Sequence, residues 1–198
     1  MVRLPSTRTG PAMLERNRIV LQIARGAIEQ AVAGAACTPL ADLPWLHTNG
    51  CSFVTLRRYG DLRGCIGSLE PFRPLGEDIA ENAVAAALHD RRFSPVEAYE
   101  LKTIEVEVSL LTPSEPLACE DEYDAMRKLR PGIDGVVIEY GQRRATFLPQ
   151  VWKNLPDVPI FLRELKRKAG LPADFWHPDL RLRRYGVEKH CERNIRDE

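Results

Sequence analysis

The chain has 198 residues, enough for one domain or for one domain made of two small halves. Its 28 lysine and arginine residues balance 28 aspartate and glutamate residues, and this zero net charge argues against a general nucleic-acid binder. No apolar run approaches the roughly 20 residues that cross a bilayer, so we expect no membrane segment.

Cysteine usage and motif content bear on the compartment and on cofactors. The five cysteines stand at positions 37, 51, 65, 119 and 191, and no pair has the C-x-x-C spacing of a zinc ribbon or a thioredoxin-type site. The simplest interpretation is reduced thiols in a cytoplasmic protein. Phosphate-binding, dinucleotide-binding and metalloprotease motifs are absent from the sequence, so we expect no metal and no cofactor.

The first half of the chain predicts a helix followed by a mixed block. We expect a flexible arm over 1–12 and then a single domain over 13–198, beginning with an amphipathic helix over 13–36. The prolines of 38–49 predict an irregular connection that Trp45 holds to the core. The elements expected next are a strand over 51–58, a tight turn at Gly60-Asp61, a strand over 62–69, a helix from Leu75 to His89, a short helix beginning at Ser94-Pro95-x-Glu97, and a strand over 103–112.

The second half repeats this order of elements without detectable sequence identity. Its expected elements are a short helix over 121–129, strands over 135–140 and 144–148, a helix between Asp157 and Gly170, and a strand over 180–185. Two β-β-α-α-β blocks, about 50–115 and 120–186, predict an α+β fold with a mainly antiparallel sheet flanked by helices. The six strands fit either one strongly curved, barrel-like sheet or two separate sheets.

The segment Leu62-Arg63-Gly64-Cys65-Ile66-Gly67 is the strongest candidate for chemistry. Two glycines in a strand cost backbone entropy, which a strand accepts for a bulge or for close approach to its backbone. Strand alternation places Arg63 and Cys65 on one face, and a neighbouring guanidinium favours the thiolate. Cys65 and Arg63 are therefore the candidate catalytic residues. The alternative is a small buried cysteine in a bulged strand, with Arg63 paired to a carboxylate.

Further residues complete the candidate binding site. We expect the Arg63 head group to face a solvent-accessible cavity and to meet an anion or a carboxylate from another segment. Glu107 is the candidate partner. It shares a strand face with Ser109 that is normally solvent-facing but would line the concave side of the sheet if the sheet curls. Asp90 and Arg92 can pair after the helix that ends at His89, a possible base for Cys65. The remaining candidate binding residues are Thr55, Gly64, Gly67 and, in the slot of the second half that matches Cys65, Thr146.

Six ordered motifs resemble one known family over about Arg16 to Arg193. They are Phe53-Val54-Thr55-Leu56, Leu62 to Gly67 (LRGCIG), Asp90-Arg91-Arg92-Phe93, Val108 to Thr112, Ala145 to Val151, and Lys168-Ala169-Gly170 with Arg184-Tyr185. Together they are similar to the AMMECR-type domain, and Phe72 to Leu75 looks closest to its bacterial branch, protein A of the AmmeMemoRadiSam system. The resemblance implies an α+β fold with a duplicated unit, and a Memo-type protein and a radical S-adenosylmethionine protein as partners. His89 departs from the family pattern, which puts a Cys65–His89 pair in doubt.

The resemblance leaves the reaction open, so three functions compete. The first is an enzyme or modification module whose cleft binds a small anionic group beside Cys65. The second is a non-catalytic adaptor that binds a partner protein through the same cleft. The third, RNA binding, is disfavoured by the zero net charge and by the lack of aromatic stacking platforms on a basic strand.

Overall fold

The computed structural model describes residues 11–36 and 42–193. The chain divides into two compact units, one formed by Met1–Leu110 with Lys189–Glu198 and the other by Leu111–Glu188. The expected arm over 1–12 lies outside the described residues except for its last two positions, which open the first helix.

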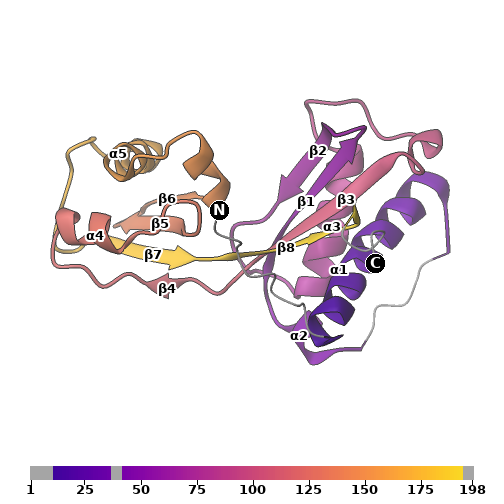
Figure 1. Ribbon diagram of the computed structural model, residues 1–198, viewed down its shortest axis with the longest axis horizontal. Helices are drawn as coiled ribbons and strands as arrows, with labels where there is room; N and C mark the ends of the chain where they lie inside the picture. Colours follow the sequence, from indigo (N-terminus) through magenta and orange to yellow (C-terminus); the bar gives the residue numbers. More distant parts are fainter. Residues whose placement is uncertain (1–10, 37–41, 194–198) are drawn as a thin grey trace, which may run out of the picture. The chain divides into compact units, whose positions relative to one another are not determined.

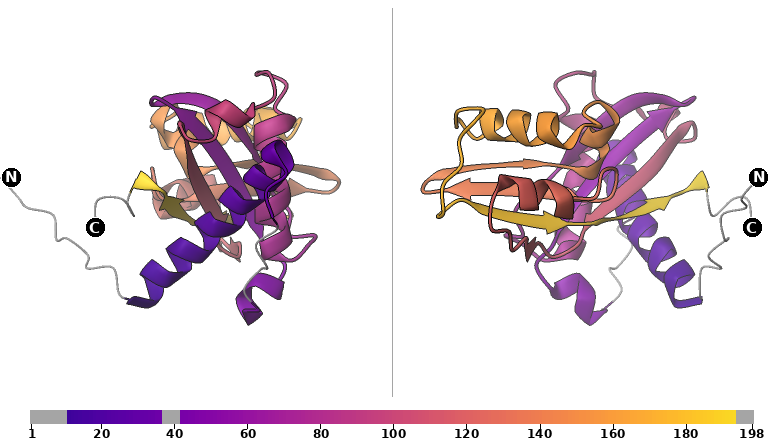
Figure 2. Two further views of the ribbon diagram at one scale, coloured as in Figure 1. Left: turned by 90° about the vertical axis from the view of Figure 1, so that its right-hand side faces the viewer. Right: turned by 60° about the vertical axis from the view of Figure 1, so that its left-hand side comes forward.

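The first unit is a four-stranded sheet with helices on one face (Figures 1 and 2). Its strand order is β2-β1-β3-β8, with β1 at Cys51–Arg58, β2 at Asp61–Gly67, β3 at Ile104–Leu111 and β8 at Val187–Cys191. The helices are α1 (Pro11–Ala33), the short α2 (Pro44–His47), α3 (Leu75–Leu88) and the 3₁₀ turn η1 (Ala98–Glu100). The core lies between α1, α3 and the sheet, where small side chains such as Ala83 and Ala86 let α3 approach closely.

The β1–β2 hairpin closes through a two-residue turn, Tyr59-Gly60, and not through Gly60-Asp61. Both turn residues have positive φ, 54° at Tyr59 and 93° at Gly60, which fits a type I′ turn. The register shifts between Leu56 and Arg57, so β2 carries the bulge that its glycines indicated.

A buried carboxylate ties the beginning of this hairpin to α3. Asp78 accepts hydrogen bonds from the Ser52 backbone N–H, the Ser52 and Ser68 hydroxyls and the Asn82 amide, at 2.7–2.9 Å. Arg73 adds an ion pair at 2.9 Å. With this many donors the charge of Asp78 is stabilised in the core, and the far end of β2 is fixed against α3.

The second unit is a separate antiparallel sheet with its own core (Figure 2). Its strand order is β4-β7-β5-β6, with β4 at Glu115–Pro116, β5 at Gly135–Tyr140, β6 at Arg143–Phe147 and β7 at Arg181–Tyr185. The helices are α4 (Glu122–Lys128), the 3₁₀ segment η2 (Pro149–Lys153) and α5 (Val158–Lys168). Asp157 caps the first turn of α5, whose Phe161, Leu162 and Leu165 are fully buried.

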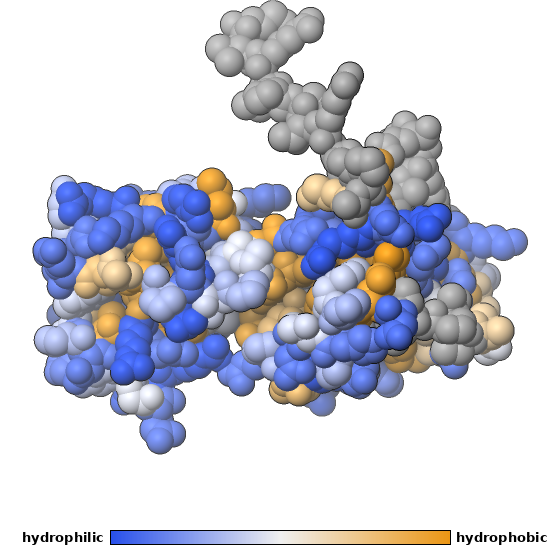
Figure 3. Space-filling model, turned by 90° about the horizontal axis from the view of Figure 1, so that it is seen from below, coloured by the Kyte–Doolittle hydropathy of each residue, from blue (hydrophilic) through white to orange (hydrophobic). Residues whose placement is uncertain are grey.

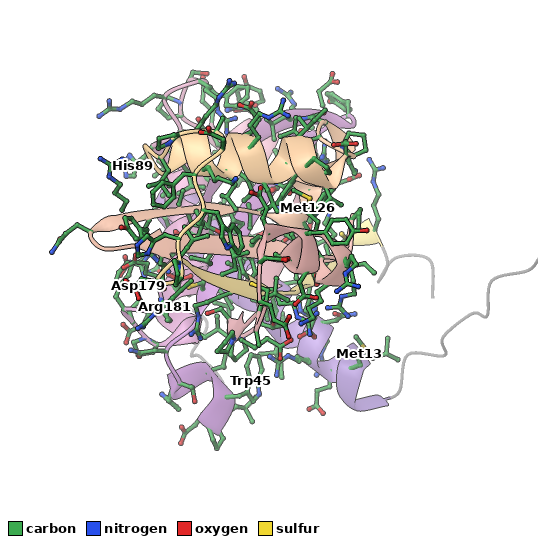
Figure 4. The ribbon with its side chains drawn as sticks, turned by 90° about the vertical axis from the view of Figure 1, so that its left-hand side faces the viewer. Met13, Trp45, His89, Met126, Asp179 and Arg181 are labelled. Atoms are coloured by element: carbon green, nitrogen blue, oxygen red, sulfur yellow. The ribbon has the colours of Figure 1, made fainter. Side chains whose placement is uncertain are left out.

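The α+β class and most expected elements are confirmed, including the two blocks of strands and helices. Over the described ranges the strands form two four-stranded sheets, and neither closes into a barrel. Sequence reasoning missed β8, a short segment without clear alternation. Trp45 packs against the core as expected, with the Arg16 guanidinium 4.2 Å above its ring (Figure 4).

Candidate functional site

Cys65 lies on β2, the edge strand of the first sheet, and its thiol is half-buried. Thr55 is directly opposite on β1, and its hydroxyl donates a hydrogen bond to the Cys65 sulfur at 3.2 Å. The neighbouring residues Val54 and Leu56 point into the core, so Thr55 and Cys65 face away from α1 and α3. The thiol is thus held by a polar neighbour on the face of the sheet that lies away from the helices.

Asp90 and Arg92 clamp the backbone of Cys65 at the free edge of β2. The Cys65 N–H donates to Asp90 Oδ2 at 2.9 Å, and Arg92 Nη2 donates to the Cys65 carbonyl at 3.2 Å. Arg92 also forms a two-pronged pair with the Asp90 carboxylate, at 2.9 and 2.6 Å. Hydrogen bonds from Arg92 and from the Cys65 and Arg92 backbone N–H groups hold the Asp90 pKa well below its usual range. The expected Asp90–Arg92 pair is therefore confirmed, and it fixes the position of Cys65.

Arg63 forms an ion pair with a buried carboxylate. Its Nε and Nη2 donate to the two oxygens of Glu100 at 3.0 and 2.8 Å, and Nη1 donates to the Ser94 carbonyl at 2.9 Å. The side chains are 13% and 4% exposed, and the pair with Arg63 lowers the pKa of Glu100 to about 2. A carboxylate from another segment meets Arg63 as expected, but it is Glu100, so the assignment to Glu107 is wrong. The Arg63 head group is largely buried against Glu100 and the Ser94 carbonyl.

The bulge explains why the side chains of Arg63 and Cys65 lie in different surroundings. Leu56 pairs with Gly64 and Arg57 pairs with Leu62, which leaves Arg63 without a cross-strand partner. Strict alternation therefore fails at this position, and the Arg63 guanidinium reaches the loop after α3. Strand alternation predicted both side chains on one face of the strand, and that prediction is wrong.

The two glycines of the motif are required by close packing. An ideal Cβ on Gly64 would lie 2.1 Å from the carbonyl oxygen of Ala86 in α3. On Gly67 it would lie 2.3 Å from the Phe53 ring and 2.6 Å from the Ser52 carbonyl oxygen. Neither glycine has a positive φ, so close approach to the backbone is the constraint.

Glu107 and Ser109 lie on β3, alternating with core residues and therefore facing away from the helices. Glu107 pairs with Lys189 at 2.6 Å and accepts a weak hydrogen bond from the Cys191 thiol at 3.5 Å. Burial, with the nearby Glu107 charge, raises the pKa of Cys191 to about 11. Glu107 and Cys191 line a hollow of about 120 Å³ with Arg57 and Arg193, so Glu107 takes part in a separate cluster on the same sheet face.

Thr146 belongs to the second unit and is buried there. Its hydroxyl lies 3.0 Å from the Tyr185 hydroxyl, which also donates to the Phe147 carbonyl at 3.2 Å. This hydrogen-bonded pair joins β6 to β7 across β5, and the Tyr185 ring fills the space over Gly135. The local contacts of Thr146 are those of a packing residue.

Sequence reasoning missed Glu100, the residue that neutralises Arg63. The signal for Glu100 is a capping box formed by Glu97 and Glu100. It lies three residues after the capping box that we expected between Ser94 and Glu97. The Glu97 N–H donates to Glu100 Oε2 at 3.0 Å, and Glu97 caps the 3₁₀ turn. His89 is exposed at the end of α3 (Figure 4).

The described part of the chain contains no group of three or more His, Cys, Asp or Glu side chains placed to hold a metal ion. None of its helices is long and apolar enough to span a membrane. Among the described cysteines, Cys65, Cys119 and Cys191 are free thiols. The chemistry available around β2 is that of a thiol, a hydroxyl and the exposed guanidinium of Arg92.

Comparison with known proteins places this arrangement in a family. The AMMECR1 family model matches residues 21–190. A protein of Methanothermobacter thermautotrophicus is 42% identical over 187 residues, which cover 90% of this chain and 95% of that protein. A second, from Methanocaldococcus jannaschii, is 41% identical over 172 residues, with 82% and 83% covered.

A solved structure agrees with these sequence matches. The crystal structure of an uncharacterised protein from Pyrococcus horikoshii superimposes with a TM-score of 0.71 at 36% identity, covering 88% of this chain and 90% of that one. The resemblance drawn from the six motifs is thereby confirmed at the level of the family. The chain belongs to the AMMECR1 family.

Proposed function

We propose that the protein acts on a substrate through the Cys65 thiol, with Arg92 holding an acidic group of that substrate. The carrying observation is that the backbone of Cys65 is fixed on both sides by Asp90 and Arg92, while its thiol stays half-exposed beside the Thr55 hydroxyl. A rigid backbone under an accessible thiol is the arrangement that a nucleophile needs.

Arg92 takes the anion-binding role first expected of Arg63. The Arg92 side chain is 55% exposed, whereas the Arg63 guanidinium donates its hydrogen bonds to Glu100 and to backbone carbonyls. A guanidinium with free donor positions binds a carboxylate or a phosphate. In the proposed step the thiol loses its proton to solvent, the sulfur bonds to an electrophilic carbon of the substrate, and the leaving group departs with the electrons of the broken bond.

The test compares alkylation rates of the individual cysteines in the folded protein. We expect iodoacetamide at pH 8 to modify Cys65 at least tenfold faster than Cys119 and Cys191, whose pKa values are raised by burial. Peptide mapping by mass spectrometry gives each rate. Inorganic phosphate or a small dicarboxylate should protect Cys65, and Arg92→Ala should abolish the protection. An unreactive Cys65 would remove the basis of this proposal.

A non-catalytic adaptor is the second candidate. The charged groups around the motif pair with one another, Arg63 with Glu100 and Asp90 with Arg92. This internal pairing is typical of a structural segment and favours the adaptor. An adaptor should keep all partner binding in Cys65→Ser, whereas the thiol mechanism requires that variant to lose turnover with binding retained.

The pathway assignment is also a proposal. Its support is the motif resemblance, which implies a Memo-type protein and a radical S-adenosylmethionine protein as partners. The relatives named above are archaeal, so membership of the bacterial AmmeMemoRadiSam branch is open to test by binding assays with the two candidate partners from the same genome. Free thiols at Cys65, Cys119 and Cys191 support a reducing, cytoplasmic setting.

A further inference from the structure

Both boundaries between the two units fall inside β-strands. The first boundary, between Leu110 and Leu111, lies in β3, and the second, between Glu188 and Lys189, lies in β8. Boundaries between independent domains normally fall in exposed, flexible linkers that few contacts cross. The two connections of this chain are therefore unlike domain linkers.

Each sheet is completed by a strand that continues directly out of the other unit. In the first unit, β8 follows β7 after Gly186 alone and adds to the edge of β2-β1-β3 (Figure 1). In the second unit, β4 follows β3 after residues 112–114 and adds to the edge of β6-β5-β7. The two units thus have the same strand order, and each receives its fourth strand from the other. We call β4 and β8 the exchanged strands.

Buried groups anchor both exchanged strands. Glu192, directly after β8, accepts a hydrogen bond from Arg25 Nε of α1 at 2.9 Å and one from the Val106 N–H at 2.9 Å. The Arg25 and Glu192 side chains are only 16% and 15% exposed. Leu117, directly after β4, is buried in the second core, and its N–H donates to the Leu182 carbonyl at 2.9 Å. Neither strand can leave its sheet without breaking these contacts.

The two connections are also hydrogen-bonded to each other. The Thr112 N–H donates to the Gly186 carbonyl at 3.0 Å, and the Gly186 N–H donates to Thr112 Oγ1 at 2.8 Å. These bonds fix the backbone at the point where β3 leads into β4 and β7 leads into β8. A movement of one connection is therefore opposed by the other.

We propose that the exchanged strands make the two units one cooperatively folding domain, in which neither unit unfolds without the other. Two separate cores, and the hydrophilic residues that cover most of the face shown in Figure 3, are what two independent domains would also have. The exchanged strands add a coupling, because unfolding of the second unit removes the partner of β4 and the tether of β8, and leaves the edge of β3 unpaired.

This coupling has a regulatory consequence that does not require the Cys65 chemistry. A ligand that binds only the folded form of a protein stabilises that form by mass action. A molecule bound to the second unit therefore also stabilises the first sheet, in which β2 carries Cys65.

The first experiment uses matched core substitutions in the full chain. Ile28 in the first core and Ile138 in the second are both 0% exposed. Hydrogen exchange followed by mass spectrometry, under conditions where the rate reports the opening equilibrium, gives the slowest amides of each unit. We expect Ile28→Val and Ile138→Val each to raise these rates in both units by the same factor, roughly two- to tenfold. An increase confined to the substituted unit would overturn the proposal.

The second experiment tests whether the exchanged strands carry the coupling. A Gly-Ser-Gly-Ser insertion after Pro113 and another after Gly186 lengthen both connections, and the same insertions after Gly60 and Gly141, in the hairpin turns, give the control chain. We expect Ile28→Val to leave exchange in the second unit unchanged when the connections are lengthened, and to raise it in the control. Transmission that survives the lengthened connections would contradict the proposal. The point substitutions decide whether the units are coupled even where the lengthened chain does not fold.

Discussion

Replacing Gly64 by alanine tests the tightest contact of the candidate site. Gly64 lies on β2 next to Cys65, where α3 crosses the strand. An added Cβ would lie 2.1 Å from the Ala86 carbonyl oxygen and 3.1 Å from its carbonyl carbon. Both atoms belong to the backbone of a packed helix, so neither can rotate aside as a side chain would.

The size of the effect follows from that geometry. Real Cβ atoms essentially never approach closer than 3.0 Å, so α3 would have to retreat from the sheet by roughly 1 Å in a close-packed interior. Overpacking costs about 1–3 kcal/mol in typical cores, and the rigid obstacle places Gly64→Ala at the upper end, about 3 kcal/mol. For a chain of this size that corresponds to a fall in melting temperature of about 6–12 °C.

Thermal unfolding followed by circular dichroism measures this fall. Gly76→Ala is the control, because it also adds one methyl group near α3 but meets only Leu46, with no atom nearer than 3.5 Å. We expect no loss of stability in the control, since alanine is the better helix former. A melting temperature of Gly64→Ala within 2 °C of the unchanged protein would refute the close-approach explanation of the motif.

Three other outcomes follow from the site. Arg63→Lys should lower the free energy of unfolding by about 1–3 kcal/mol in urea titrations, because lysine cannot form the two-pronged pair with buried Glu100; unchanged stability would mean that this pair contributes nothing. Cys65→Ser should cost less than about 1 kcal/mol, because the serine hydroxyl can bond to Thr55 where the thiol did, and a melting temperature lowered by more than 5 °C would instead identify a packing role. Glu100 has a folded pKa of about 2 against 4.5 for the ordinary group, so its contribution is complete above pH 4.5 and is lost as the pH falls toward 2. Over that window the loss amounts to roughly 3 kcal/mol, and Glu100→Gln should flatten the acid limb of stability plotted against pH; an unaltered acid limb would contradict the assignment.

Local sequence patterns were sufficient for most of the elements. Alternation of apolar and polar residues over 103–112 predicted β3, and the Asp157 and Gly170 signals bracketed α5. These features act within a few residues, so they can be interpreted without knowing the rest of the fold. The two glycines of the LRGCIG segment likewise indicated either a bulge or close approach to the backbone, and the structure shows both.

Prediction of the candidate site succeeded where partners are close in sequence. Asp90 and Arg92 are two residues apart, and their pairing is confirmed at 2.6 Å. Arg63 and Glu100 are 37 residues apart, and Glu107 was an equally charged competitor on β3, which β1 separates from β2. Choosing between the two glutamates required the path of the loop after α3, which no short-range pattern specifies.

The sequence by itself determined the class of fold and the segment in which Cys65 lies, because hydrophobic periodicity and glycine content are properties of short stretches. The family followed from the resemblance of six ordered motifs. Tertiary structure alone decided that the strands form two sheets, that Glu100 neutralises Arg63, and that Arg92 is the cation left exposed beside the thiol. Each of these depends on segments distant in sequence being packed together. A single bulged residue in β2 was enough to send the Arg63 side chain away from the surroundings of Cys65, and that shift is visible only once β1 is in place.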